Sequence, residues 1–273
     1  MDDRDCVRFL QLTLPRLQLR WRGFRRVRRQ VCRRLQQRLR ALELPDLAAY
    51  ERYLDLHPPE WNRLDACCRI TISRFYRDHG IFRLLEHEAL PQLARLAREN
   101  GRQQLDAWSA GCGAGEEPYT LAILWTHSPE PALLQIPAAI TATDADPVML
   151  QRADRACYPF SSIRGLPPDW RDVAFRPADG EYCLQPYYRQ PVRFMAQDIR
   201  HATPGGPFDL VLCRNLAFTY FADDLQQATA ARIGSALRPG GLLVLGEHEK
   251  LPRDQDGFTP WRAGLPLYRR LPA

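Results

Sequence analysis

The feature of this sequence that most constrains its fold is the glycine-rich turn within residues 106–120, Asp-Ala-Trp-Ser-Ala-Gly-Cys-Gly-Ala-Gly-Glu-Glu-Pro-Tyr-Thr. Gly111, Gly113 and Gly115 follow a short apolar run and precede a segment with a helical pattern. Glycines at a strand-to-helix turn let a ligand approach bare backbone, and the free N–H groups of the helix point at that ligand. The turn predicts a cofactor loop, although glycine-rich turns also serve purely structural roles.

An acid at the end of a second apolar run strengthens this interpretation. The run Ile140-Thr-Ala-Thr-Asp144 ends roughly thirty residues after the turn, where nucleotide-binding βαβ units place the acceptor of the ribose hydroxyls. This pattern is typical of S-adenosylmethionine (SAM) sites and of dinucleotide sites alike. From Leu105 onward, apolar strands and helical segments alternate, which predicts right-handed βαβ units and a mostly parallel sheet.

Further motifs distinguish between these two cofactors, because together they resemble one enzyme family. They are Ser73–Asp78, Trp108–Tyr119, Ala142–Asp146, Phe208–Asn215 and Pro239–Glu247. In this order they are similar to the Thr-x-Phe-Phe-Arg segment, the glycine loop ending in Gly-Glu-Glu-Pro-Tyr, and the second, fourth and fifth strands of the CheR-type methyltransferases. Members of that family use SAM to esterify glutamates on bacterial chemoreceptors.

The resemblance implies an α/β fold, with the doubly wound, mostly parallel seven-stranded sheet of a class I methyltransferase. It also implies a small all-α N-terminal domain and a small antiparallel β insertion. We expect the helical domain at residues 1–85 and the SAM-binding Rossmann-like domain at residues 86–273, with the insertion at residues 158–196. A helix is predicted over residues 81–100, ending at Asn100-Gly101.

The net charge of +6 is concentrated near the N-terminus. Residues 16–40 contain no acidic residue, and their apolar positions recur at intervals of three and four, which predicts an amphipathic helix with a basic outer face. Such a face would suit an acidic protein such as a receptor helical bundle, or nucleic acid. Because Lys250 is the only lysine, the arginines could instead reflect genome composition on a solvated helix. The resemblance favours the protein substrate and makes nucleic acid the weaker alternative.

Composition excludes several classes of protein. The chain has 273 residues, of which 45% are hydrophobic, and no apolar stretch approaches the length of a membrane span. The N-terminus has no signal-peptide hydrophobic region, so we expect a soluble, cytoplasmic protein without membrane insertion. Eight cysteines without a Cys-x-x-Cys pair predict buried free thiols rather than disulfides or a zinc site, and no metal is expected.

SAM carries a carboxylate, an ammonium, a sulfonium and a ribose diol, and the sequence offers a partner for each of these groups. Arg77 would bind the carboxylate through a bidentate fork, Glu117 or alternatively Glu116 would face the positive methionyl end, and Asp144 would accept the diol. Surface ion pairing of Arg77 and charge complementarity of the two glutamates at a helix N-terminus remain alternatives.

The resemblance adds further residues to the predicted cofactor site. Asp198 stands where the family usually has asparagine beside the adenine, and Asn215 matches the residue beside the transferring methyl, unless it merely caps a turn. Thr71 stands where the family usually carries asparagine. The complete predicted cofactor-binding set is Thr71, Ser73, Arg77, Gly111, Gly113, Gly115, Glu117, Asp144, Asp198, Ile199, Asn215 and Leu216.

Methyl transfer to a carboxylate needs alignment and a dry site but no general base, because the acceptor is already ionised. The family orients its acceptor with a tyrosine after the fourth strand. Here the stretch from Asn215 to Tyr220 is one residue longer than the family pattern. Tyr220 is therefore the predicted acceptor-positioning residue, with Thr219 as its rival, and the predicted catalytic residues are Tyr220, Asn215 and Arg77.

The sequence thus predicts a SAM-dependent methyltransferase of the CheR type, with S-adenosylhomocysteine as the product. A protein glutamate is the leading acceptor, and a small molecule is the second candidate. A non-catalytic SAM-binding regulatory protein is the remaining alternative. A nucleic-acid amino-methyltransferase is disfavoured because Cys213-Arg-Asn215-Leu does not match the Asn/Asp-Pro-Pro-aromatic motif of those enzymes.

Overall fold

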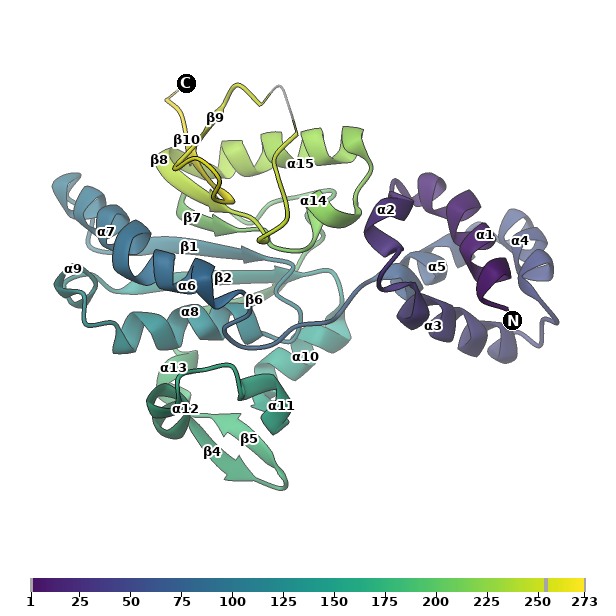
Figure 1. Ribbon diagram of the computed structural model, residues 1–273, viewed down its shortest axis with the longest axis horizontal. Helices are drawn as coiled ribbons and strands as arrows, with labels where there is room; N and C mark the ends of the chain where they lie inside the picture. Colours follow the sequence, from purple (N-terminus) through teal and green to yellow (C-terminus); the bar gives the residue numbers. More distant parts are fainter. Residues whose placement is uncertain (1, 253–254, 273) are drawn as a thin grey trace. The chain divides into compact units, whose positions relative to one another are not determined.

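The computed structural model describes residues 2–252 and 255–272, and the chain divides into two compact units (Figure 1). Unit 1 comprises Met1–Thr71 and Leu216–Gln226, and unit 2 comprises Ile72–Asn215 and Gln227–Ala273. The first division therefore falls between Thr71 and Ile72 rather than at residue 85. A late segment also returns to unit 1, which no sequence pattern had indicated.

Unit 2 is built on a seven-stranded sheet in the order β6-β2-β1-β7-β8-β10-β9. The first five strands pair in parallel, and β10 pairs antiparallel with both β8 and β9. This arrangement confirms the predicted class I fold. The strands are β1 (Leu105–Ala110), β2 (Ala138–Asp144), β6 (Val192–Ala196), β7 (Phe208–Leu212), β8 (Leu237–Val244), β9 (Phe258–Pro260) and β10 (Leu267–Arg270).

The order of the strands fixes where a ligand can bind. The chain winds outward from β1 to β2 and β6, and then continues on the other side of β1 with β7 and β8. In open α/β sheets, ligands bind at the carboxyl ends of the strands beside such a switch point. The central strands β1 and β7 are almost entirely buried, as expected for parallel strands covered on two faces.

Helices cover both faces of this sheet (Figure 1). On one face α8 and α10 contact β2 and β6, and α7 contacts β1, while α15 lies on the other face (Figure 1). The helix predicted over residues 81–100 is α6, a π-helical turn at Leu85–Ala89, and α7, which ends one residue before Asn100. The helices are α6 (His79–Leu84), α7 (Leu90–Glu99), α8 (Glu116–His127), α9 (Pro131–Leu134), α10 (Pro147–Arg155), α14 (Ala217–Tyr220) and α15 (Asp223–Ala236).

The predicted insertion after β2 is a three-stranded antiparallel sheet in the order β3-β5-β4, with short helices α11, α12 and α13. Its helices α12 and α13 contact α8. The run at residues 192–196, which we had included in the insertion, instead forms β6 of the main sheet. The elements are β3 (Cys157–Tyr158), α11 (Phe160–Ile163), α12 (Pro168–Ala174), β4 (Phe175–Ala178), β5 (Glu181–Leu184) and α13 (Pro186–Arg189).

The helices of unit 1 differ from the single basic helix predicted over residues 16–40. A left-handed Gln18 ends a 3-10 turn at Leu14–Leu17, and residues 25–27 separate two further helices. The apolar stripe is correct within the second of these, where Val31, Leu35 and Leu39 are buried. The helices are α1 (Asp3–Thr13), α2 (Trp21–Phe24), α3 (Arg28–Ala41), α4 (Leu47–Leu56) and α5 (Glu60–Cys68).

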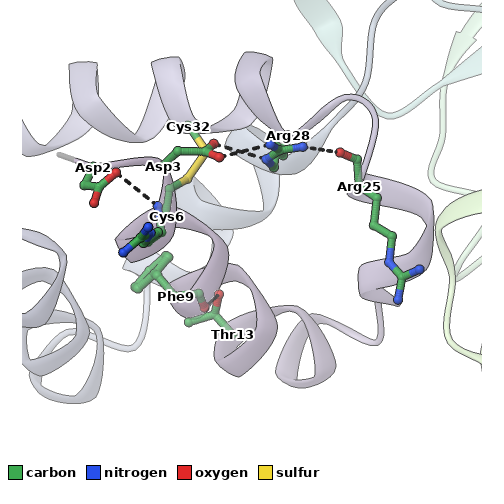
Figure 2. Close-up of a disulfide and its surroundings, with 9 residues drawn as sticks. Asp2, Asp3, Cys6, Phe9, Thr13, Arg25, Arg28 and Cys32 are labelled. Carbon is green, nitrogen blue, oxygen red and sulfur yellow. Dashed lines mark hydrogen bonds and ion pairs between the residues drawn. A yellow bond between two sulfur atoms is a disulfide. The ribbon is translucent and has the colours of Figure 1, made fainter.

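Two disulfides correct the expectation of free thiols. Cys6 of α1 is bonded to Cys32 of α3, beside an ion pair between Asp3 and Arg28 (Figure 2). Cys157 is bonded to Cys183 across the β3–β5 pair. Each bond joins cysteines 26 residues apart, so no local motif could reveal it. The other four cysteines, Cys67, Cys68, Cys112 and Cys213, take part in neither disulfide.

A search of the described residues, 2–252 and 255–272, finds no helix both long enough and apolar enough to cross a membrane.

Candidate cofactor site

The predicted glycine loop connects β1 to α8 at the carboxyl end of β1. The φ angles of Gly111, Gly113 and Gly115 are positive, at 72°, 56° and 90°. Residues other than glycine rarely adopt such angles. A Cβ at Gly115 would lie 3.1 Å from both Ala153 and the Tyr119 ring, so this glycine is required for packing. A Cβ at Gly113 would meet only the Cβ of Ser73, at 4.0 Å. The backbone of Gly113 is therefore open to a ligand.

The structure brings Asp144 to this loop. One carboxylate oxygen of Asp144, at the end of β2, accepts a hydrogen bond from the Gly113 N–H at 2.8 Å, and the other accepts from the Asp146 N–H at 2.8 Å. A carboxylate has about four acceptor positions. These two backbone bonds fix the orientation of Asp144 at the loop, where the ribose diol of SAM is predicted to bind.

Glu117 lies on the β1 side of the loop and is held by two partners. Its carboxylate accepts from the Ser109 hydroxyl at 2.8 Å and forms an ion pair with Arg214 at 2.9 Å. The glutamate is thus oriented by side chains of β1 and of the residues after β7, and not only by the N-terminus of α8. The structure brings Glu117, the loop and the end of β7 together.

Arg214 is the principal residue of this region that the sequence interpretation missed. Only 2% of its side chain is exposed, and it donates to the Asp78 carboxylate at 2.9 Å and to the Arg77 carbonyl at 2.8 Å, besides binding Glu117. Its guanidinium also lies 5.0 Å from the centre of the Phe82 ring. Its Nε has no hydrogen-bond partner among the described residues. An arginine two residues after the end of the apolar strand Phe208–Leu212 was the available signal.

Arg77 is positioned mainly through its backbone. Its carbonyl binds Arg214, and its guanidinium donates to the Ile72 carbonyl at 3.0 Å. The flanking Tyr76 and Asp78 both have left-handed backbone conformations, so the chain turns sharply on each side of Arg77. The predicted carboxylate-binding residue therefore belongs to the same network as Glu117.

Glu116 occupies a different environment from its neighbour Glu117. It is 4% exposed, its Oε1 accepts a 3.4 Å hydrogen bond from Ser162, and its Oε2 has no partner among the described residues. Burial raises the pKa of Glu116 above its ordinary value, and hydrogen bonds from Ser73 and Ser162 offset only part of this effect. Glu116 therefore contributes a buried carboxyl group behind the loop, next to Ser73.

Asn215 marks the junction between the ends of β7 and β8. It has a left-handed backbone, with φ of 56°, and its N–H donates to Glu249 at 2.7 Å. The Gly246 N–H donates to the same carboxylate oxygen at 2.7 Å, and a Cβ at Gly246 would lie 2.9 Å from the Asn215 Oδ1. The buried Glu249 thus joins the two strand ends. It lies beyond the Pro239–Glu247 motif, so no pattern had indicated it.

Asp198 follows β6 and is strongly paired with its neighbour Arg200. Both of its carboxylate oxygens accept from Arg200, in an ion pair with a closest distance of 2.6 Å. Burial acts to raise the pKa of Asp198, but the hydrogen bonds and charge of Arg200 outweigh it and hold the pKa below its usual value. Ile199 beside it is buried.

The remaining predicted residues, Thr71, Leu216, Thr219 and Tyr220, belong to unit 1. The Thr71 hydroxyl accepts hydrogen bonds from Arg34 at 3.1 Å and Gln30 at 3.3 Å, both on α3. Tyr220 ends α14, and its ring centre lies 5.1 Å from that of Phe24.

Comparisons with known proteins agree with this geometry. A family model described as CheR methyltransferase, SAM binding domain, matches residues 71–263. A chemotaxis protein methyltransferase of Pseudomonas aeruginosa is 34% identical over 189 residues, which cover 67% of this chain and 68% of that protein. One from Listeria monocytogenes is 33% identical over 187 residues, which cover 68% of each chain. An uncharacterised 104.1 kDa protein of Rhodobacter capsulatus is 31% identical over 241 residues, 88% of this chain but 25% of its own length.

Two solved structures show a partial likeness to this chain. Magnesium protoporphyrin IX methyltransferase of Synechocystis, with bound SAM, has 17% identity and a TM-score of 0.35, covering 68% of this chain and 80% of that one. The N-methyltransferase NodS of Bradyrhizobium japonicum, with S-adenosylhomocysteine, has 18% identity and a TM-score of 0.31, covering 60% and 64%.

The family model spans more than half of the chain and contains the glycine loop, Asp144, Arg214 and Asn215. The chemotaxis relatives independently exceed 30% identity over two thirds of the chain. The chain therefore belongs to the CheR family of methyltransferases, and its cofactor is S-adenosylmethionine.

Proposed function

We propose that this methyltransferase transfers the methyl group of SAM to the side-chain carboxylate of a protein glutamate, and that an acidic region of a chemoreceptor is its acceptor. The relatives named as chemotaxis protein methyltransferases, at 33% and 34% identity, support this acceptor class. A small-molecule acceptor is the alternative. The observation that carries the proposal is a set of three interactions that join the strand ends. The Asp144 carboxylate accepts a hydrogen bond from the Gly113 N–H, and the Glu249 carboxylate accepts one from the Asn215 N–H. Arg214 forms an ion pair with Glu117.

Each residue of the cofactor half has a proposed role. When bound, SAM supplies a methyl group on a positively charged sulfonium. Asp144 accepts the ribose hydroxyls, Glu117 faces the positive methionyl end, and Arg77 binds the methionine carboxylate. Gly113 has no side chain to obstruct the ligand and allows close approach to its backbone, and Asp198 and Ile199 border the adenine. Ser73, Thr71 and Leu216 complete the contacts.

The acceptor half requires less chemistry. A glutamate side chain has an ordinary pKa of about 4.3, so it reaches the enzyme as a carboxylate and no residue has to remove a proton. The chain then only aligns the acceptor and excludes water. Asn215 would lie next to the methyl group, and the Tyr220 hydroxyl would orient the acceptor carboxylate, with Thr219 as the alternative.

A basic surface of unit 1 supports an acidic protein partner. Several arginines of α3 are already engaged: Arg28 binds Asp3, Arg38 binds Glu60, and Arg34 binds the Arg69 carbonyl. Other arginines within residues 21–41 are exposed and have no ion-pair partner among the described residues. We name these the basic surface: Arg22, Arg26, Arg29, Arg33 and Arg40. Unpaired cations on one small unit attract polyanions and accelerate their association.

Labelling with methyl-labelled SAM tests the proposal. The purified protein is incubated with the membrane and soluble fractions of its host, and the label is followed before and after mild alkali. Alkali-labile label in protein identifies a methyl ester of a carboxylate. Label in low-mass material would instead support a small-molecule acceptor. SAM binding without transfer to any fraction would overturn the catalytic proposal.

A further inference from the structure

A short segment late in the chain is folded into unit 1. Leu216–Gln226, which begins shortly after the end of β7, pairs with the turn at residues 18–20. The Arg20 N–H donates to the Tyr220 carbonyl at 2.8 Å, and the Ala222 N–H donates to the Gln18 carbonyl at 2.8 Å. Leu19 and Phe221 form an antiparallel bridge between these two bonds. The backbone around Tyr220 is therefore fixed by residues that are distant in sequence. Arg20 and Thr219, for example, are 199 residues apart.

The side chain of Arg20 strengthens this pairing. Its guanidinium donates to the Phe218 carbonyl, to the Thr219 carbonyl at 3.1 Å and to the Asp223 carboxylate at 3.3 Å. The last carbonyls of a helix have no partner within it, and α14 is only four residues long. Arg20 supplies partners for two of them. Because three acceptors lie around one planar group, a lysine could not replace all of these bonds.

Residues after Arg20 also pack closely against the segment Leu216–Gln226. A Cβ at Gly23 would lie 2.3 Å from the Thr219 carbonyl oxygen, so only glycine fits at that position. The Phe24 ring, which is 1% exposed, lies 5.1 Å from the Tyr220 ring at 57°. Arg20, Gly23 and Phe24 thus contact the backbone of residues 218–220 or the ring of Tyr220. We call this set the 20–24 clasp.

We propose that Arg20 is a positioning residue for methyl transfer, which acts by fixing Tyr220 through the 20–24 clasp. This inference rests on the proposed role of Tyr220 in orienting the acceptor. The stretch between Asn215 and Tyr220 is one residue longer than the pattern it resembles, and a longer loop has more conformations available to its final side chain. The clasp removes that freedom by bonding three consecutive carbonyls, from Phe218 to Tyr220.

The test compares Arg20→Met and Arg20→Lys with Arg8→Met, a control on α1 whose arginine is exposed, lies outside the basic surface and has no ion-pair partner among the described residues. Calorimetry measures SAM affinity. The rate of alkali-labile methyl incorporation into the host membrane fraction, titrated by total protein, gives apparent kcat and KM. A misplacement of about 1 Å can cost about a hundredfold in rate. We expect Arg20→Met to lower kcat at least tenfold, Arg20→Lys to lower it less, and both to keep SAM affinity within twofold.

A double-mutant cycle separates positioning from general loss of structure. In a Tyr220→Phe background, Arg20→Met should lower kcat by less than twofold, because the group that it positions is already absent. Equal effects in both backgrounds would overturn the inference. So would an unchanged kcat in Arg20→Met when Tyr220→Phe impairs transfer. If Arg20→Met does not fold, Arg20→Lys and Phe24→Leu are used in the same cycle.

Failure of the proposed glutamate methyltransferase function can be distinguished from failure of the positioning role of Arg20. A wild-type protein that binds SAM but produces no methyl ester contradicts the glutamate methyltransferase assignment, whatever Arg20 does. An active wild type whose kcat does not depend on Arg20 contradicts only the positioning role. Hydrogen exchange of the peptide covering residues 216–222 reports on the clasp itself, and we expect faster exchange in Arg20→Met than in Arg8→Met.

Discussion

Arg214 and Glu117 form an ion pair at 2.9 Å in which only 2% of the arginine side chain is exposed. Removing one partner of a buried ion pair leaves an unpaired charge, which typically costs about 3–5 kcal/mol. We expect Arg214→Met to lower the free energy of unfolding by about 3 kcal/mol, since both Glu117 and Asp78 lose their partner. Urea denaturation measures the change.

The control for this prediction is Arg262→Met, which breaks an exposed ion pair with Glu88. Exposed pairs contribute about 0–1 kcal/mol, so this variant should be nearly neutral. Equal destabilisation by the two variants would contradict the buried role of Arg214. Adding Glu117→Gln to Arg214→Met should recover part of the loss, because it removes one of the two uncompensated charges.

Asp144→Ala should weaken SAM binding by about 1.5–3 kcal/mol, the usual range for a hydrogen bond to a charged group. The Asp144 carboxylate also accepts a hydrogen bond from the Gly113 N–H, so the glycine loop loses this bond in the same variant. Calorimetry with SAM measures the difference. Asp146→Ala is the control, because Asp146 caps α10 through the Val148 N–H and has no proposed contact with SAM. Equal SAM affinity in wild type and Asp144→Ala would refute the assignment.

Glu116 should make stability depend on pH with a defined sign. Burial raises its pKa in the folded protein, so the folded state binds this proton more tightly than the unfolded state does. The stability contributed by the protonated form is present at low pH and is lost as pH rises from the ordinary glutamate value through the folded pKa. Glu116→Gln should therefore be more stable than wild type at neutral pH, with a smaller decline as pH rises.

Thermal unfolding between acidic and neutral pH measures this dependence. Glu247→Gln is the matched control, since Glu247 is exposed and should leave the profile unchanged. A Glu116→Gln profile parallel to that of wild type would contradict a raised pKa of Glu116 in the folded protein.

Reversing Arg26, Arg29 and Arg33 of the basic surface to glutamate should raise the apparent KM for a protein acceptor and leave SAM affinity unchanged. Added salt should raise the KM of the wild type in the same way, because exposed charges are screened over about 10 Å at 0.1 M ionic strength. Kinetics at several salt concentrations measure both effects. Steeply salt-dependent binding to DNA or RNA that the triple variant loses would instead indicate a nucleic-acid partner.

Thiol alkylation under denaturing, non-reducing conditions should modify four of the eight cysteines, Cys67, Cys68, Cys112 and Cys213. Prior reduction should expose all eight. Loops closed by bonds 26 residues apart are expected to stabilise the protein by about 3–4 kcal/mol each, so reduction should also lower the unfolding temperature. Mass spectrometry counts the modified thiols. Modification of all eight without reduction would contradict both disulfides.

The sequence predicted the sheet, the family and the cofactor because those depend on local patterns. The glycine loop and Asp144 are each recognisable from a few consecutive residues, and parallel-strand geometry then brings them together. The fold could also be read from the continuous apolar runs of β1 and β7, which are buried on both sides.

Features that depend on distant pairing were missed. Neither disulfide has a local signature, and the first break in the basic helix lies where the turn at residues 18–20 bonds to residues near 220. Arg214 and Glu249 resembled ordinary strand-end residues, since what distinguishes them is the set of partners brought to them by other elements. Helical periodicity describes one face of a helix and carries no information on these partners.

The path of the chain between the two units has a consequence for dissecting this protein. The family model begins at residue 71, which suggests cutting there to obtain a minimal enzyme. A fragment starting at Ile72 would still contain residues 216–226 but would lack Gln18, Leu19 and Arg20, to which that segment is bonded. The N-terminal helices are therefore not a detachable module, and exchanging them between relatives would require exchanging this internal stretch as well.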